Sequence, residues 1–158
     1  MKKLIFALSF VCLSLFSLSA FAVSKPRDVF VQTSPQATIT KLDTPHTYQL
    51  SLQNIQAYTT YFSDRPSRTS NMMTLESFLA VWNKGFAKDA PNASISGIIN
   101  EKMVNFPAEL TQPVYDAATK TLTYIIHPLA GTEDKIPSSL HISNVSVFID
   151  PLCLTCFG

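Results

Sequence analysis

The sequence is poor in glycine, cysteine and histidine, and it contains no run of like charges. Only four glycines, three cysteines and three histidines occur among its 158 residues. It has no Gly-x-Ser-x-Gly elbow, no His-Glu-x-x-His pair and no glycine-rich phosphate loop, so the common hydrolase, zinc-protease and nucleotide-binding motifs are missing. Twelve Lys and Arg residues stand against eleven Asp and Glu residues. That balance argues against nucleic acid or an acidic membrane surface as a partner, because both require a concentrated basic face.

The longest apolar run lies at the N-terminus and has the form of an export signal. Two lysines at positions 2 and 3 precede an apolar run over residues 4–18, and Ala20 and Ala22 are small residues at a signal-peptidase spacing. The run is shorter than the ~20 apolar residues that a transmembrane helix requires. We therefore predict that residues 1–22 are a removed signal peptide, and that residues 23–158 form one domain in the periplasm or outside the cell, with no integral membrane segment.

Cleavage after Ala22 changes the interpretation of the cysteines. Only Cys153 and Cys156 remain, and an even number of cysteines in an oxidising compartment favours a disulfide. The alternatives are a redox pair or a metal clip. A thioredoxin-like pair needs a following helix, but only two residues follow Cys156, and zinc needs two further ligands at a suitable spacing. No metal and no cofactor are predicted.

Most of residues 23–158 has the composition and alternation of β-strands. Residues 38–42 and 48–53 alternate around a turn and predict a hairpin with Tyr48, Leu50 and Leu52 on its buried face. A second hairpin is predicted around residues 115–119. The remaining predicted strands cover residues 29–31, ended by Ser34-Pro35, and residues 58–62, 93–99 and 141–149.

One helix is predicted in the middle of the chain. Its apolar stripe has helical spacing and consists of Leu75, Phe78, Leu79, Trp82 and Phe86. Thr74 is a suitable N-cap, and Gly85 is expected to end the helix in a left-handed conformation. About seven strands with this inserted amphipathic helix predict a mainly β, β-sandwich-like domain with the helix across one end. An α+β fold with the helix on one sheet face is the alternative.

Two loops carry candidate binding residues. Asp64, Arg65 and Arg68 lie just before the helix, and two arginines three residues apart can bind a carboxylate or phosphate. The alternative is a structural corner, in which Asp64 accepts backbone N–H groups and Arg65 pairs with a buried acid such as Glu109 or Asp116. The second loop is the turn after the helix, with Asp89 and Asn92.

Histidine chemistry is the remaining catalytic alternative. His127 and His141 fall on separate predicted strands, and either could act with an acid in a small periplasmic hydrolase, because such groups are recognised by geometry and not by sequence position. Without a catalytic motif, enzyme activity is not the favoured interpretation. We expect a non-catalytic binding or interaction module whose partner is an unidentified protein or small molecule.

The chain resembles a family of small exported proteins in segments spread over most of its length. The shared residues are Tyr61-Phe62-Ser63-Asp64-Arg65-Pro66, then Thr74, Phe78, Trp82 and Gly85, Phe86-Ala87-Lys88-Asp89, Pro91-Asn92-Ala93, Glu109-Leu110, Pro113, Tyr115-Asp116 and Phe148-Ile149-Asp150. The resemblance implies export but no activity, cofactor or substrate. The two C-terminal cysteines fall outside the shared pattern.

Overall fold

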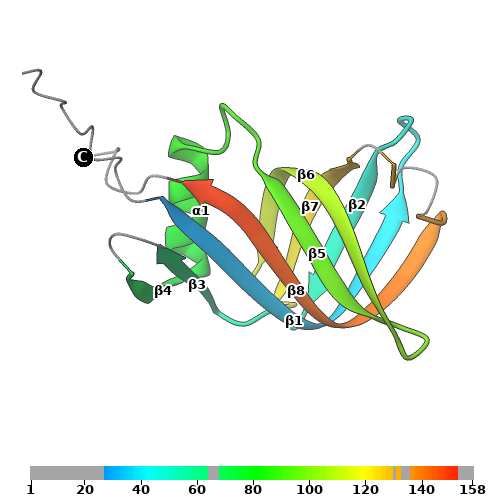
Figure 1. The fold of residues 1–158 in the computed structure, drawn as a ribbon, viewed down its shortest axis with the longest axis horizontal. Helices are drawn as coiled ribbons and strands as arrows, with labels where there is room; N and C mark the ends of the chain where they lie inside the picture. Colours follow the sequence, from blue (N-terminus) through cyan, green and yellow to red (C-terminus); the bar gives the residue numbers. More distant parts are fainter. Residues whose placement is uncertain (1–26, 64–67, 130, 133–135, 153–158) are drawn as a thin grey trace, which may run out of the picture.

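The computed structural model describes residues 27–63, 68–129, 131–132 and 136–152. In chain order the elements are β1 (Asp28–Lys41), β2 (Tyr48–Gln53), β3 (Tyr58–Ser63), β4 (Ser70–Thr74), α1 (Leu75–Lys84), β5 (Asn92–Ile99), β6 (Lys102–Asp116), β7 (Thr121–Pro128) and β8 (Ser139–Leu152). The predicted mainly β domain with a single inserted helix is confirmed (Figure 1). The predicted signal peptide and both C-terminal cysteines lie outside the described residues.

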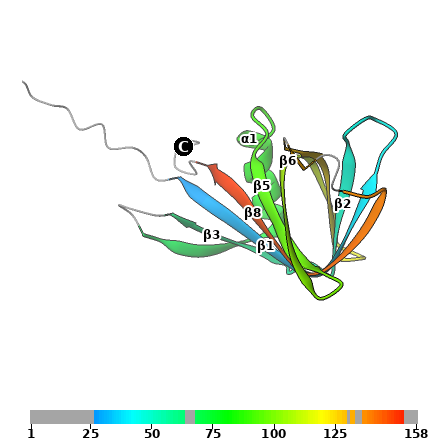
Figure 2. The same cartoon turned by 45° about the vertical axis from the view of Figure 1, so that its right-hand side comes forward.

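The strands form one antiparallel sheet that closes on itself. Its order is β2-β7-β6-β5-β8-β1-β3-β4, and β2 pairs in addition with β1. Six strands therefore make a closed ring, while β3 and β4 continue from β1 as a two-stranded extension. Figure 2 shows the ring strands curving around a common interior, with β3 directed away from it. The two halves of the ring face each other across the core, but hydrogen bonding is continuous between them.

Strand β1 belongs to both parts of the sheet. Its first residues, Asp28 to Val31, pair with β3, and the stretch from Gln36 to Lys41 pairs with β2. The sequence interpretation ended a strand at Ser34-Pro35, and that boundary is wrong, because β1 is continuous through it. On one side of β1, Pro35 lies in the interval where the neighbour changes from β3 to β2. On the other side, the pairs with β8 include Ser34 and Gln36 but not Pro35, as expected for a residue without an N–H.

The predicted hairpins are present with the expected buried faces. Thr40 pairs with Gln49, and Tyr48, Leu50 and Leu52 are buried. The predicted turn at residues 115–119 connects β6 to β7, where Asp116 accepts hydrogen bonds from the Ala118 backbone at 2.9 Å and the Thr119 hydroxyl at 2.9 Å. These hydrogen bonds hold the pKa of the Asp116 carboxyl below its usual value, the side-chain bond from Thr119 being the largest cause.

Helix α1 packs its apolar stripe against the inner side of the sheet. Thr74 is the N-cap and accepts a hydrogen bond from the Ser77 backbone at 3.2 Å. The left-handed end predicted at Gly85 is wrong, because Gly85 has φ −111° and the chain continues into a turn. The centroids of the Phe30 and Phe78 rings are 5.4 Å apart, and those of Trp82 and Tyr124 are 5.6 Å apart. Through these aromatic contacts the helix packs against both β1, which carries Phe30, and β7, which carries Tyr124.

Candidate functional site

The predicted loop residues are brought to two separate places. Arg68 is exposed, has φ 49° and precedes β4 by two residues. Asp89 and Asn92 are exposed at the connection from α1 to β5. Figures 1 and 2 show the start of β4 and the start of β5 well apart, so these residues do not form one site. Asp64 and Arg65 lie outside the described residues.

A hollow adjoins the connection that carries Asp89 and Asn92. Its volume is about 370 Å³, and it lies between the end of α1 and a bulge of β6 where Gln112 has φ 49°. The aromatic side chains in its lining are Trp82 and Phe86, which are only 3% and 4% exposed. They therefore offer a ligand little ring surface, and the hollow is a weak candidate for a ligand site.

The two histidines considered for catalysis lie on different strands and face different groups. His127 is half-buried on β7 and is the cross-strand neighbour of Glu109 on β6. His141 is exposed on β8, with its Nδ1 atom 3.4 Å from the Thr38 hydroxyl. Within the described ranges, no Asp or Glu makes a hydrogen bond or ion pair with His141, and no group of three metal-binding side chains occurs. The part of the chain that is described thus supplies no acid to orient the exposed histidine.

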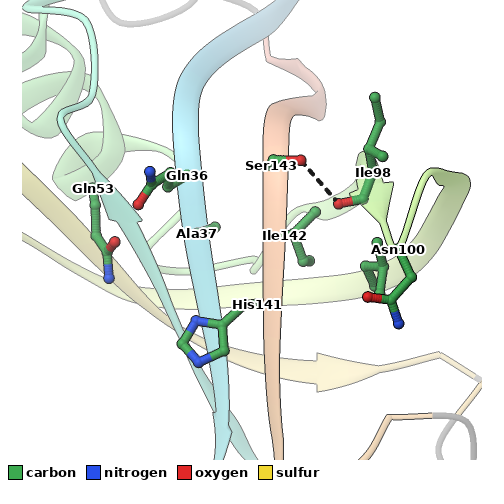
Figure 3. Close-up of a pocket in the computed structure, with 9 residues that line it drawn as sticks. Gln36, Ala37, Gln53, Ile98, Asn100, His141, Ile142 and Ser143 are labelled. Carbon is green, nitrogen blue, oxygen red and sulfur yellow. Dashed lines mark hydrogen bonds between the residues drawn. The ribbon is translucent and has the colours of Figure 1, made fainter.

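His141 borders a small polar pocket on β1 and β8 (Figure 3). Its volume is about 250 Å³, and Ala37, Ile98, Ile99 and Ile142 form its apolar part. The polar side chains around it are uncharged amides, a hydroxyl and the imidazole: Gln36, Gln53, Asn100, Ser143 and His141. Two of these side chains already make hydrogen bonds within the protein. Ser143 donates to the Ile98 carbonyl at 3.2 Å, and Gln53 donates to the Thr38 hydroxyl at 3.2 Å.

The chemistry of this pocket suits a small neutral ligand, but its size is limiting. Ligand pockets in proteins usually measure about 300–1,000 Å³. The pocket lies below that range, and Gln36, Asn100, His141 and Ser143 are exposed, so a bound molecule would stay largely in water. It is therefore a weak candidate for a ligand site.

The strongest surface feature is an apolar face on the outer side of β4, β3, β1 and β8. Six large hydrophobic side chains are exposed among the described residues, and four of them lie here: Tyr58, Phe62, Met72 and Phe148, at 45%, 36%, 66% and 44% exposure. We call these four residues the outer apolar face. The other two, Met103 and Val114, lie near opposite ends of β6.

Strand register places these side chains on one side of the sheet. Met72 is opposite Thr60, Thr60 is opposite Val31, and Val31 is opposite Phe148, which gives one continuous row across four strands. Phe62 lies opposite Val29 in the adjacent row. Side chains of paired residues point to the same face of a sheet, so the four apolar side chains share one face, with the half-buried Thr60 and Val31 between Met72 and Phe148. The charged Arg68 lies at its edge, just before β4.

The sequence interpretation missed this face, although part of its signal is present. Alternation in residues 58–62 puts Tyr58, Thr60 and Phe62 on one side and Thr59 and Tyr61 on the other. In β3, Thr59 is fully buried and the Tyr61 ring lies 6.0 Å from that of Phe30, so the inner side carries threonine and tyrosine while the outer side carries phenylalanine. Two aromatic residues, Tyr58 and Phe62, on the solvent side of one strand are the part of this surface that the sequence alone indicates.

A buried carboxyl lies at the start of β1, beside the end of β3. Asp28 is 7% exposed and pairs with Ser63 at the end of β3. Burial raises the pKa of the Asp28 carboxyl above its usual value of 3.8. The Ser63 hydroxyl lies 2.7 Å from that of Thr69, which ties the end of β3 to the residue before β4.

Comparison with protein-family models, with curated proteins and with solved structures finds no match. The helix in the described part of the chain, α1, is not long and apolar enough to cross a membrane.

Proposed function

We propose that this protein is an exported, non-catalytic interaction module that binds another protein through the outer apolar face. The observation that carries the proposal is the continuous row Met72–Thr60–Val31–Phe148, in which two large apolar side chains are exposed at its ends. Scattered exposed hydrophobic residues are ordinary, but a contiguous apolar surface marks an interaction site.

The composition of this face fits a protein partner better than a small molecule. Aromatic residues and methionine are enriched at protein interfaces, and charged residues are depleted at interface centres. Tyr58, Phe62, Met72 and Phe148 supply the aromatic and thioether groups, and Arg68 lies at the rim. Arginine at a rim contributes to orientation and association rate more than to affinity. The surface is a sheet face and not an enclosed cavity, which favours a partner with a surface of its own.

Export is part of the proposal, and it rests on the sequence of residues 1–22. Processing after Ala22 predicts that the mature chain begins at Val23, and mass spectrometry of the protein from the periplasm or medium tests this. Cys153 and Cys156 are proposed to form a disulfide in that compartment. Thiol titration of the isolated protein tests this: two fully oxidised, poorly reducible sulfurs favour a structural bridge over a redox pair, and bound metal on isolation favours a metal clip.

Site-specific photo-crosslinking tests the interaction face. A photo-reactive phenylalanine analogue is placed at Phe62 or Phe148 in the full chain, and at Val114 as a matched control that is 63% exposed on β6. The proposal predicts a discrete adduct from the two face positions and none from Val114. It also predicts that Met72→Lys, which adds a charge to the same face, weakens the adduct from Phe148. Equal results at all three positions would contradict it.

A further inference from the structure

Four neighbouring strands of the ring carry no charged side chain over most of their length. No Asp, Glu, Lys or Arg occurs in residues 29–40 of β1, 48–53 of β2, 92–99 of β5 or 139–149 of β8. In the sheet these strands adjoin in the order β5-β8-β1, and β2 pairs with the other side of β1. Charged residues make up 15% of the whole chain, so an uncharged surface of this extent sets this part of the ring apart.

Two hollows lie one after the other along the paired strands β1 and β8 of this region. The first is the pocket beside His141 (Figure 3), and the second has a volume of about 400 Å³. The residues of β1 and β8 that line the first hollow are 36–37 and 141–143, and those that line the second are 33–35 and 144–146. Because these residue numbers are consecutive on both strands, the hollows occupy neighbouring positions of one strand pair. A linear ligand made of repeated units can therefore contact both.

Side-chain amides surround the two hollows, and four of them make no hydrogen bond with any other described residue. These four are exposed and belong to Gln36, Asn54, Gln56 and Asn144. Asn54 and Asn144 have φ values of 53° and 50°, in the left-handed region that asparagine adopts more readily than most residues. Each side-chain amide has two donors and an acceptor oxygen. The hollows thus offer a bound molecule both donors and acceptors without a net charge.

The lining argues against several classes of ligand. A nucleic acid or an acidic polymer requires lysine and arginine, and neither occurs among the described residues that line the hollows. A lipid tail requires a broad apolar floor. Most of the apolar lining is covered, since Ala37, Ile142 and Val145 are at most 3% exposed, and Ile98 and Ile99 are half-buried. A protein interface usually has Tyr, Trp or Phe at its centre, and the described lining contains none of them.

We propose that the two hollows bind a neutral, linear saccharide chain through the amides and hydroxyls of β1, β8 and the β2–β3 connection. Such a chain carries many hydroxyl groups, which match amide donors and acceptors, and it brings no charge that would need a partner in the protein. Shallow hollows suit it, because a second unit of the same chain binds at a high effective concentration once the first is bound. The lining residues differ from those of the outer apolar face, so this inference is independent of the proposed protein partner.

Titration of the mature chain with maltohexaose, cellohexaose and chitohexaose, followed by NMR of the side-chain amide signals of isotope-labelled protein, tests the proposal. We expect at least one of these neutral chains to bind with a dissociation constant of about 1 mM or below. It should shift the amide signals of Gln36 and Asn144 and leave unchanged that of Asn71, an exposed amide on β4. Hexagalacturonate, which carries a carboxylate on each unit, is expected not to bind, because the lining offers it no cation.

Variants that change an amide to the acid of the same shape separate recognition from folding. Asn144→Asp and Gln36→Glu replace two donors by a charged acceptor, and aspartate tolerates the left-handed φ of position 144. Each is expected to raise the dissociation constant of the bound saccharide roughly three- to tenfold, the equivalent of one lost hydrogen bond. The matched change Asn71→Asp on β4 should leave it unchanged.

Four outcomes would overturn the inference. They are no binding of any of the three neutral chains, equal binding of hexagalacturonate, an Asn71 signal that shifts as much as that of Asn144, and acid variants that bind like the original chain. None of these outcomes involves the photo-crosslinking positions Phe62 and Phe148. Failure of the saccharide site and failure of the proposed protein interface are therefore distinguishable.

Discussion

The hydroxyl group of Tyr124 donates a 2.8 Å hydrogen bond to the side-chain oxygen of Gln32 inside the fold. The amide of Gln32 in turn donates to the Thr59 hydroxyl at 3.2 Å. All three residues are at most 1% exposed, and they belong to β7, β1 and β3. This buried chain of hydrogen bonds therefore connects the closed ring to the extension that carries the outer apolar face.

Replacing Tyr124 by phenylalanine tests the importance of this connection. The change leaves the Gln32 oxygen buried without its donor, and a buried unpaired polar group costs about 1–3 kcal/mol. We expect the free energy of unfolding, measured by urea denaturation, to fall by that amount. Tyr115→Phe is the control, because Tyr115 lies on β6 and is only partly buried. Equal stability of the two variants would show that the Gln32 hydrogen bond contributes nothing.

Trp82 should be the most sensitive position of the helix. Its ring lies 5.8 Å from that of Phe78, 5.1 Å from that of Phe86 and 5.6 Å from that of Tyr124. Trp82→Ala removes these contacts and leaves a cavity, which typically costs about 3–5 kcal/mol. The exposed neighbour Asn83→Ala is expected to change stability by less than about 0.5 kcal/mol. A thermal melt of both variants measures the difference, and similar melting temperatures would contradict the packing described.

Gly97 is expected to tolerate no side chain. A Cβ atom at this position would collide with Cγ2 of Ile142 and approach the Ser143 carbonyl to 2.9 Å. Overpacking of this kind usually costs about 1–3 kcal/mol, so Gly97→Ala should lower the free energy of unfolding by that amount. The matched change Gly131→Ala adds a Cβ with no neighbour within 4 Å, and it tests backbone strain alone because Gly131 has φ +85°. A Gly97→Ala variant as stable as the original would contradict the close approach of β5 and β8.

Asp28 should make stability depend on pH in a defined direction. Burial raises its pKa in the folded protein above the usual 3.8, so at neutral pH the folded state contains an unfavourable buried carboxylate. This penalty disappears as the pH falls through the raised pKa and the carboxyl takes up a proton. Asp28→Asn should therefore stabilise the protein at pH 7, with the gain shrinking toward pH 4. Urea denaturation at both pH values measures the gain, and an equal gain at both would contradict burial as the cause.

Local patterns predicted the helix and the hairpins, because their signals lie within a few residues. The stripe from Leu75 to Phe86 and the alternation of Tyr48, Leu50 and Leu52 both correspond to buried faces. The continuation of β1 through Pro35 could not be predicted, since it depends on a change of neighbouring strand there. Closure of the sheet through β1 and β2 likewise depends on the order of strands distant in the chain.

The candidate site was harder to predict than the fold. Strand β4 has neither clear alternation nor β-branched residues other than Thr74, so its sequence does not indicate a strand. The row that joins Met72 to Phe148 exists only because β1 lies between β3 and β8. Of the predicted contact residues, Arg68 lies at the rim of that surface, whereas Asp89 and Asn92 lie at another place in the fold.

Methionine oxidation gives the most direct test of the outer apolar face, because the chain contains its own control. Met72 is 66% exposed on the face, and Met103 is 92% exposed away from it. Mild peroxide treatment of cells that produce the protein, followed by mass spectrometry, gives the ratio of oxidation at the two sites. We predict that this ratio is several-fold lower in cells than in dilute purified protein, because a bound partner covers Met72. The same ratio in both conditions would contradict the account.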